Sequence, residues 1–468
     1  MKDSGAESLK RTLGATQLVA LGIGAIIGAG LFSLTGIAAS QNAGPAVVLS
    51  FVIAAVGCAF AGLCYSEFAT MIPIAGSAYT YAYATMGELI AWIIGWDLVL
   101  EYAVGAATVG VSWSRYVMSF FADFGIAFPP QLAASPFEPV TLPETGQVIE
   151  GIINLPAFFI IVAISLLLIV GIQESARVNA FIVLLKVAVV AVFIALGWAY
   201  IDPNNFTPFI PANTGEFGAF GWSGVLRGAG LVFFAFIGFD AVSTAAQEAK
   251  HPQKDMPIGI IGSLAVCTVL YVLFSHVLTG IVNYTELNSA APVAVAIDRT
   301  DYRWLRPAIK LAIIAGYTSV ILVMLLGQSR VFFAMSRDGL LPKLFSDVHP
   351  KFRTPWRSNM LFMVITGLLA ALAPIQVLGE ATSIGTLFAF VLVCGGIMIM
   401  RRTHPELKRP FRTPWVPLIP MLGIAFNLTL MAGLGWTNWA RLFGWMALGL
   451  AVYFAYSRKH SITHNIES

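Results

Sequence analysis

The sequence predicts an all-α integral membrane protein. Of its 468 residues, 58% are hydrophobic and only 11% are charged, and the mean hydropathy is +0.81. An ordinary soluble domain carries about 25% charged residues, so a water-soluble fold could not bury this much apolar surface. Because a spanning helix needs about 20 mostly apolar residues, the chain has room for about twelve spans with short connections.

The apolar runs give the order of these spans along the chain. We expect an N-terminal segment 1–15, five spans within 16–201, an outer linker 202–219, five spans within 220–400, two further spans within 401–457 and a tail 458–468. The first run is longer than the apolar region of a signal peptide and has no clear cleavage site, so it should remain as span 1. The spans are expected near 16–40, 46–71, 88–120, 152–171, 180–201, 220–247, 257–283, 308–335, 358–375, 380–400, 415–434 and 439–457.

The distribution of Lys and Arg predicts the orientation. With these spans, nineteen of the 27 basic residues fall on the side of both termini, seven fall on the other side and Lys186 lies within a span. Short cytoplasmic loops retain Lys and Arg, so both termini are expected in the cytoplasm and the protein in the cell membrane. The net charge of +3 is then a topology signal, and no partner made of nucleic acid is expected.

Neither catalysis nor metal binding is expected. All four cysteines lie in apolar runs, where a thiol packs as a small hydrophobic group. Of the six histidines only His276 lies within a span, and none has the spacing of metal ligands. We therefore expect no enzyme activity, no metal and no cofactor, and membrane lipid is the expected surrounding; the sequence does not indicate whether an accessory membrane subunit exists.

Span 1 has an unusual density of glycine. Residues 21–36 read LGIGAIIGAGLFSLTG, and each glycine costs about 1 kcal/mol relative to alanine in a helix interior. Such a run either lets another helix approach closely or marks an interruption of the helix. Span 6 favours the interruption, because Gly238 and Asp240 stand near the middle of its apolar run. Corresponding broken helices, five spans apart, are typical of transporters with inverted repeats.

The two interruptions predict a binding site made of backbone groups. A half-helix that begins after the break at Ile27 would present the N–H groups of Gly28, Ala29 and Gly30, with the positive end of its dipole, to a carboxylate. The half-helices that end at the breaks would present carbonyl groups to an ammonium group; these are the carbonyls of Ile26, Phe234 and Ile237. A ligand that carries both groups on adjacent atoms is an α-amino acid.

Several motifs resemble one family. The chain is similar to the amino acid, polyamine and organocation transporter superfamily, and within it to the cationic amino acid transporter family, over roughly residues 10–460. The resemblance implies a LeuT-like fold with a 5+5 inverted repeat, broken helices 1 and 6, and amino acid transport by alternating access. The motifs are IGAGLF at 27–32, PIAGSAY at 73–79, GWDLVLEY at 95–102, FAFIGFDA at 234–241 and SRDGLLP at 336–342.

Two departures from the family pattern leave the substrate class open. Ala29 stands where some members of the superfamily have a serine hydroxyl, and the chain ends soon after its twelfth span, whereas eukaryotic cationic transporters have fourteen. Small neutral amino acids and cationic amino acids both remain candidates. Phe234 and Met324, on spans 6 and 8, are expected to flank the substrate side chain, although either could be an ordinary core residue.

Lys186 is the candidate for proton coupling. It lies seven residues into span 5 from Asn179, or about 10 Å deep at 1.5 Å per residue. The resemblance implies that a lysine here replaces the sodium ion that related transporters bind between spans 1, 5 and 8. A lysine that exchanges its proton would couple transport to a proton gradient without sodium, whereas a lysine that extends to the interface would be structural.

Three acids within the spans are further candidates. Asp97 and Glu101 lie one turn apart on span 3 and share a face; they either couple protons or pair with Arg115 or water. Asp240 either stabilises the bend of span 6 or senses the substrate amine. Glu67 is expected to be solvated and without a role. Exchange of amino acids and sodium-driven symport remain alternatives to proton symport, and a channel is the more distant one.

Overall fold

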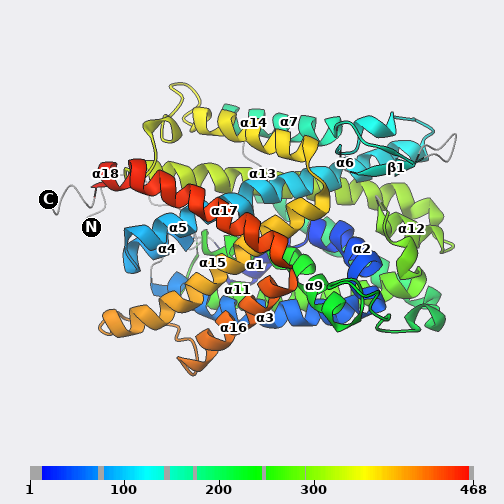
Figure 1. The fold of residues 1–468 in the computed structure, drawn as a ribbon, viewed down its shortest axis with the longest axis horizontal. Helices are drawn as coiled ribbons and strands as arrows, with labels where there is room; N and C mark the ends of the chain where they lie inside the picture. Colours follow the sequence, from blue (N-terminus) through cyan, green and yellow to red (C-terminus); the bar gives the residue numbers. More distant parts are fainter. Residues whose placement is uncertain are drawn as a thin grey trace.

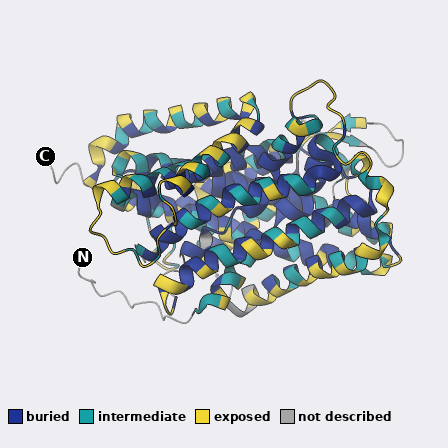
Figure 2. Ribbon diagram, turned by 90° about the horizontal axis from the view of Figure 1, so that it is seen from below, coloured by how far each residue is buried: buried dark blue, intermediate teal, exposed yellow. Residues whose placement is uncertain are grey.

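The structure, a computed structural model, describes residues 13–71, 78–136, 138–141, 148–171, 176–244, 249–289 and 291–462. Most of the helices run roughly along the long axis of the molecule (Figure 1). Buried residues fill the middle of the bundle and exposed residues cover its outer helices (Figure 2). Most of the PIAGSAY motif at 73–79 lies outside the described residues.

The first half of the described chain contains eight α-helices and one hairpin. The hairpin pairs its two strands antiparallel, with Pro139 opposite Glu150. Three π-helical turns interrupt spans 1 and 3: η1 (Gly30–Leu34), η2 (Ala39–Ala43) and η4 (Leu100–Val104). The α-helices and strands are α1 (Ala15–Ile26), α2 (Thr35–Ala38), α3 (Val47–Met71), α4 (Ala78–Thr85), α5 (Glu88–Val99), α6 (Gly105–Asp123), β1 (Pro139–Thr141), β2 (Val148–Glu150), α7 (Leu155–Val170) and α8 (Ala176–Gly197).

In the second half, all the described elements are helices or short helical turns. A 3-10 turn, η8 (Phe233–Phe236), follows α9, and a π-helical turn, η12 (Tyr453–Ser457), follows α17. The helices are α9 (Gly221–Val232), α10 (Ala241–Thr244), α11 (Pro252–Ile281), α12 (Pro292–Asp298), α13 (Arg306–Arg337), α14 (Trp356–Leu372), α15 (Ile375–Thr403), α16 (Leu418–Gly433), α17 (Trp436–Val452) and α18 (Arg458–His460).

The apolar helices agree with the predicted membrane class. Among the described residues six stretches are long and apolar enough to cross a membrane, or seven if α16 and the helix after it, bent by 112°, form one span. The remaining predicted spans coincide with shorter apolar helices: Ala15–Ile26, Leu155–Val170, Gly221–Phe236 and Trp356–Leu372. Breaks and bends shorten these helices, so the total of twelve spans stays a prediction from the sequence.

Hydrogen bonds identify the two ends of the bundle. At one end, here called the termini end, Leu13 bridges Ala249 and the N–H of Ile462 donates to the carbonyl of Asp338. At the opposite end, here called the far end, the Asn42 side chain donates to the carbonyl of Gly218. The first and last described residues therefore lie at the same end, which is what an even number of spans requires.

The prediction that Glu67 is solvated is wrong. Glu67, on α3, is completely buried and accepts two hydrogen bonds from Arg401 of α15, at 3.0 and 2.7 Å. The backbone N–H of Thr413 donates to the same carboxylate at 2.7 Å, and Arg409 lies 3.4 Å away. The carboxylate thus joins the end of α3 to the loop after α15. A buried carboxylate is stable here because several donors replace the lost water.

We expect Glu67→Ala to lower the free energy of unfolding by about 3 kcal/mol, because it leaves two arginines without their buried partner. The measurement is thermal unfolding of the purified protein in detergent. Glu286→Ala is the matched control, since its pair with Arg299 is exposed and should contribute less than about 1 kcal/mol. Equal losses of stability in the two variants would contradict a structural role for Glu67.

Candidate functional site

Span 1 is interrupted where the glycine motif predicts it. The helix α1 ends at Ile26, and Ile27 is extended, with φ −70° and ψ 111°. The carbonyl of Gly28 then accepts the N–H groups of Leu31 and Phe32, at 3.1 and 3.3 Å, and the chain continues as the π-helical turn η1. The first N–H groups of a helix have no partner within it. The break therefore presents donors at the start of the second half of span 1.

Span 6 is interrupted in the same way. The 3-10 turn η8 ends with the N–H of Ile237 donating to the carbonyl of Phe234 at 3.2 Å. Gly238 follows with φ +115°, a conformation that side chains with a Cβ rarely adopt. Asp240 comes next, before the short helix α10. The FIGFDA sequence thus ends one half-helix and starts another, as expected from the sequence.

The two breaks pack directly against each other. A Cβ on Gly30 would lie 2.3 Å from the Cα of Ala235, and a Cβ on Gly238 would lie 2.8 Å from the carbonyl oxygen of Ala25. Tyr271 of α11 joins the breaks, since its hydroxyl contacts the carbonyls of Ile26 and Ala235 at 3.1 and 2.8 Å. The glycines are needed here because the two backbones approach each other more closely than side chains allow.

The arrangement can bind a small zwitterion through backbone groups. The donors of Gly28 to Gly30 stand at a helix start, where the dipole favours an anion. The carbonyl of Ile26 accepts one hydrogen bond from Tyr271 and has a second lone pair for an ammonium group. The predicted residues Ile26, Ile27, Ala29, Phe234 and Ile237 are all buried around this point.

Lys186 lies beside the first half of span 1. Its side chain is only 2% exposed, and its Nζ donates to the carbonyl of Gly24 at 2.8 Å. The aliphatic part of the lysine side chain passes Gly316 of α13. A Cβ on Gly316 would lie 3.0 Å from the Cε of Lys186. Lys186 is therefore held between spans 1, 5 and 8 and does not extend to the surface.

The three acids Asp97, Glu101 and Asp240 are buried in the same part of the bundle. Glu101, on the π-helical turn η4, lies close enough to both Asp97 and Asp240 to interact electrostatically with them. Among the described residues the carboxyl oxygens of Asp97 have no hydrogen-bond partner. The alternative that Arg115 pairs with these acids is wrong, because Arg115 binds Glu138 at 2.7 Å.

Uncharged side chains border the space beside the glycine motif. Val320 of α13 would lie 3.5 Å from a Cβ on Gly28. Met324 lies one turn further along α13, near Gly105 of α6. A Cβ on Gly105 would be 3.2 Å from the Sδ of Met324 and 3.5 Å from the methyl group of Thr382. Absence of a side chain at Gly105 thus leaves room for Met324, which is 7% exposed.

A layer of aromatic residues closes the site toward the far end, and the sequence did not single it out. The hydroxyl of Tyr116 donates to the carbonyl of Phe32 at 2.8 Å, and Tyr317 shares a hydrogen bond of 2.9 Å with Ser33. The two tyrosine rings pack edge to face at 5.7 Å. Tyrosines within apolar runs were the sequence signal that could have identified this layer, because buried hydroxyl groups need hydrogen-bond partners. We call Phe32, Tyr116 and Tyr317 the outer aromatic layer.

Comparison with known proteins identifies the family. Residues 13–456 match the model of the amino acid permease family. The branched-chain amino acid permease BcaP of Bacillus subtilis is 48% identical over 462 residues, 98% of this chain and 95% of that protein. The methylthioribose transporter of the same organism is 43% identical over 459 residues, with 98% and 96% covered.

A human relative extends the likeness to the cationic amino acid transporters. Cationic amino acid transporter 4 of Homo sapiens is 30% identical over 579 residues, with 98% of this chain and 89% of that protein covered. These proteins are transporters and not enzymes, and members of the family have the LeuT-like fold. The chain therefore belongs to the amino acid permease family of the amino acid, polyamine and organocation superfamily, and it is a multi-pass membrane transporter.

Proposed function

We propose that the protein is a proton-coupled, sodium-independent symporter of branched-chain and other small neutral L-amino acids. The observation that carries the proposal is the packing of the two broken helices against each other, since helix-start donors and carbonyls with a second lone pair then lie close together. A zwitterion satisfies both kinds of group at once. The proton gradient is then the energy source, and no cofactor takes part.

Two features support a neutral substrate. The side chain that meets the Cβ position of Gly28 is the uncharged Val320, and Met324, one turn further along α13, is uncharged as well. In addition, two bacterial relatives are named branched-chain amino acid permeases, and they are 48% and 35% identical to this chain. A branched apolar side chain gains free energy by burial among such residues, at about 25 cal/mol per Å², whereas a cationic one would need a partner for its charge.

Lys186 supports coupling to protons. Its ammonium group already donates to the carbonyl of Gly24, so a sodium ion bound nearby would be repelled. The hydrogen bond ties α8 to the last turns of α1 when the lysine is protonated. Loss of the proton would weaken this connection and let α1 move, as alternating access requires. Glu101 and Asp240 are the other groups that could carry the proton.

The distribution of positive charge indicates which end of the bundle faces the cytoplasm. The termini end holds the arginines around Glu67, namely Arg401 and Arg409, and most of the basic residues counted in the sequence. By the rule that cytoplasmic loops retain positive charge, we place this end in the cytoplasm and the far end outside the cell membrane.

Transport of a panel of labelled amino acids into proteoliposomes tests the substrate class. Leucine, isoleucine and valine should accumulate when an inward proton gradient is imposed, with or without sodium, whereas arginine should not. Leucine methyl ester should compete poorly, because it lacks the carboxylate charge that the helix start binds. Strong competition by the ester or by methylthioribose, which has neither charged group, would contradict the backbone site.

Substitution of Gly28 tests the position of the site. Gly28→Val should abolish leucine binding and leave the fold intact, because a Cβ there meets only Val320, at 3.5 Å. Gly30→Val should instead impair folding, since Ala235 lies 2.3 Å from the Cβ position. Gly444→Val is the control, because nothing lies within 4 Å of a Cβ there. Equilibrium binding and thermal unfolding separate these effects; wild-type affinity in Gly28→Val would place the site elsewhere.

Substitution of Lys186 tests the coupling. Lys186→Ala should lose accumulation driven by a pH difference and keep leucine binding, because the backbone site stays intact. Lys186→Arg should also fail, since a guanidinium group does not release its proton. Lys343→Ala, at an exposed position, is the matched control. If Lys186→Ala liposomes still concentrate leucine on a pH difference alone, coupling belongs to Asp97, Glu101 or Asp240.

A further inference from the structure

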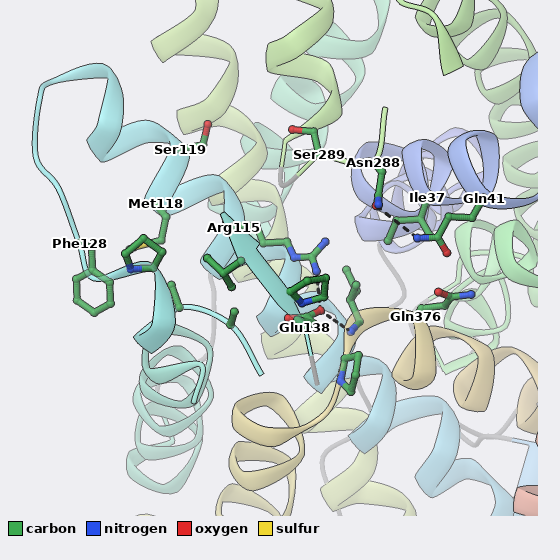
Figure 3. Close-up of a pocket in the computed structure, with 17 residues that line it drawn as sticks. Ile37, Gln41, Arg115, Met118, Ser119, Phe128, Glu138, Asn288, Ser289 and Gln376 are labelled. Carbon is green, nitrogen blue, oxygen red and sulfur yellow. Dashed lines mark hydrogen bonds and ion pairs between the residues drawn. The ribbon is translucent and has the colours of Figure 1, made fainter. Parts of the chain in front are cut away.

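A cavity of about 620 Å³ lies at the far end of the bundle, outside the glycine site (Figure 3). This volume is in the range of binding sites for small molecules, about 300–1,000 Å³. Figure 3 shows side chains that line it from the end of span 1, the end of α6, the segment that leads to β1, the loop before α12 and the start of α15; they include Gln41, Met118, Glu138, Asn288 and Gln376.

The cavity contains one cationic and one anionic side chain. Arg115 and Glu138 form an ion pair of 2.7 Å, and their side chains are 20% and 14% exposed. Glu138 is also fixed by backbone donors, because the N–H groups of Ser135 and Ile375 lie 3.2 and 3.4 Å from its carboxylate. Breaking a mostly buried ion pair is costly unless new partners replace the lost ones. A ligand that supplies a carboxylate to Arg115 could replace Glu138 as its partner, while the backbone donors keep Glu138 in position.

The cavity is adjacent to the closed side of the glycine site. Arg115 precedes Tyr116, which belongs to the outer aromatic layer and donates to the carbonyl of Phe32. Ile37 lines the cavity and lies seven residues after Gly30, or about two helical turns along the same span. The cavity therefore lies near the outer aromatic layer, on the far-end side of the glycine motif.

From these observations we propose that the cavity is an outer binding site for the zwitterion of an α-amino acid, with Arg115 for the carboxylate and Glu138 for the ammonium group. Binding replaces one internal ion pair with two pairs to the ligand, so no charge is left without a partner. The carboxamides of Gln41, Asn288 and Gln376 add hydrogen-bonding groups on the walls. The proposal rests on the proposed function, since it assigns the same ligand to a second site.

Protection of a single introduced cysteine from a thiol reagent tests the outer site. The four native cysteines are buried, so a charged methanethiosulfonate should react mainly with Met118→Cys, or with Gln376→Cys on the opposite wall. Both are made in the Gly28→Val background, which removes binding at the inner site. Leucine should slow the modification several-fold in nanodiscs, whereas 4-methylpentanoate and leucine methyl ester, which each lack one charge, should not.

Arg115→Gln should abolish this protection, and Arg299→Gln, which removes an exposed arginine paired with Glu286, should leave it unchanged. Protection that survives Arg115→Gln would overturn the assignment. The assignment would also be overturned if leucine protected neither cysteine in the Gly28→Val background, although the same cysteine variants with Gly28 intact take up leucine. If those variants take up no leucine, the proposed function itself fails, and the two failures are thereby distinguished.

Discussion

The demand of backbone groups for hydrogen bonds in an apolar interior governs this structure. Two helices are interrupted in the middle of the bundle, where an unpaired N–H or C=O group is costly. The interruptions are tolerated because they lie against each other and because other helices supply donors. The single hydroxyl proton of Tyr271 is within reach of the carbonyls of Ile26 and Ala235, and Lys186 donates to Gly24. In the proposed function, the groups that remain are those that bind the substrate.

The same demand explains the distribution of small residues. Gly30 and Gly238 allow the two breaks to touch, since a Cβ at either position would collide with the backbone of the other break. Gly105 and Gly316 serve a different purpose, because each leaves room for a long side chain, that of Met324 or Lys186. Glycine is therefore used both to bring backbones together and to admit long side chains between helices.

The two ends of the bundle differ in how they are closed. At the termini end, Glu67 binds Arg401, and Tyr79 donates to Asp338 at 2.6 Å. Burial raises the pKa of Asp338, although the hydrogen bond from Tyr79 opposes this shift. At the far end lies a cavity lined by Arg115 and Ile37. Glu67 is buried with several donors and stabilises the termini end, whereas the pair of Tyr79 and Asp338 is a single hydrogen bond.

The sequence by itself determined the membrane class, the order of the apolar helices and the position of both breaks. These follow from composition and from local backbone preferences, which glycine changes within a few residues. The resemblance to a family supplied the place of Lys186 between three spans. Short motifs also identified Asp240 and the residues around Gly28, because each of these motifs lies within one short stretch of the chain.

Only the tertiary structure decided the partners of buried polar groups. Glu67 binds Arg401, which is 334 residues away, Tyr271 reaches a carbonyl 245 residues away, and Arg115 binds Glu138 instead of the acids of its own span. No local pattern specifies such contacts, because they depend on which helices pack side by side. The physical reason is that a buried polar group takes whichever partner the packing of distant helices brings within about 3 Å.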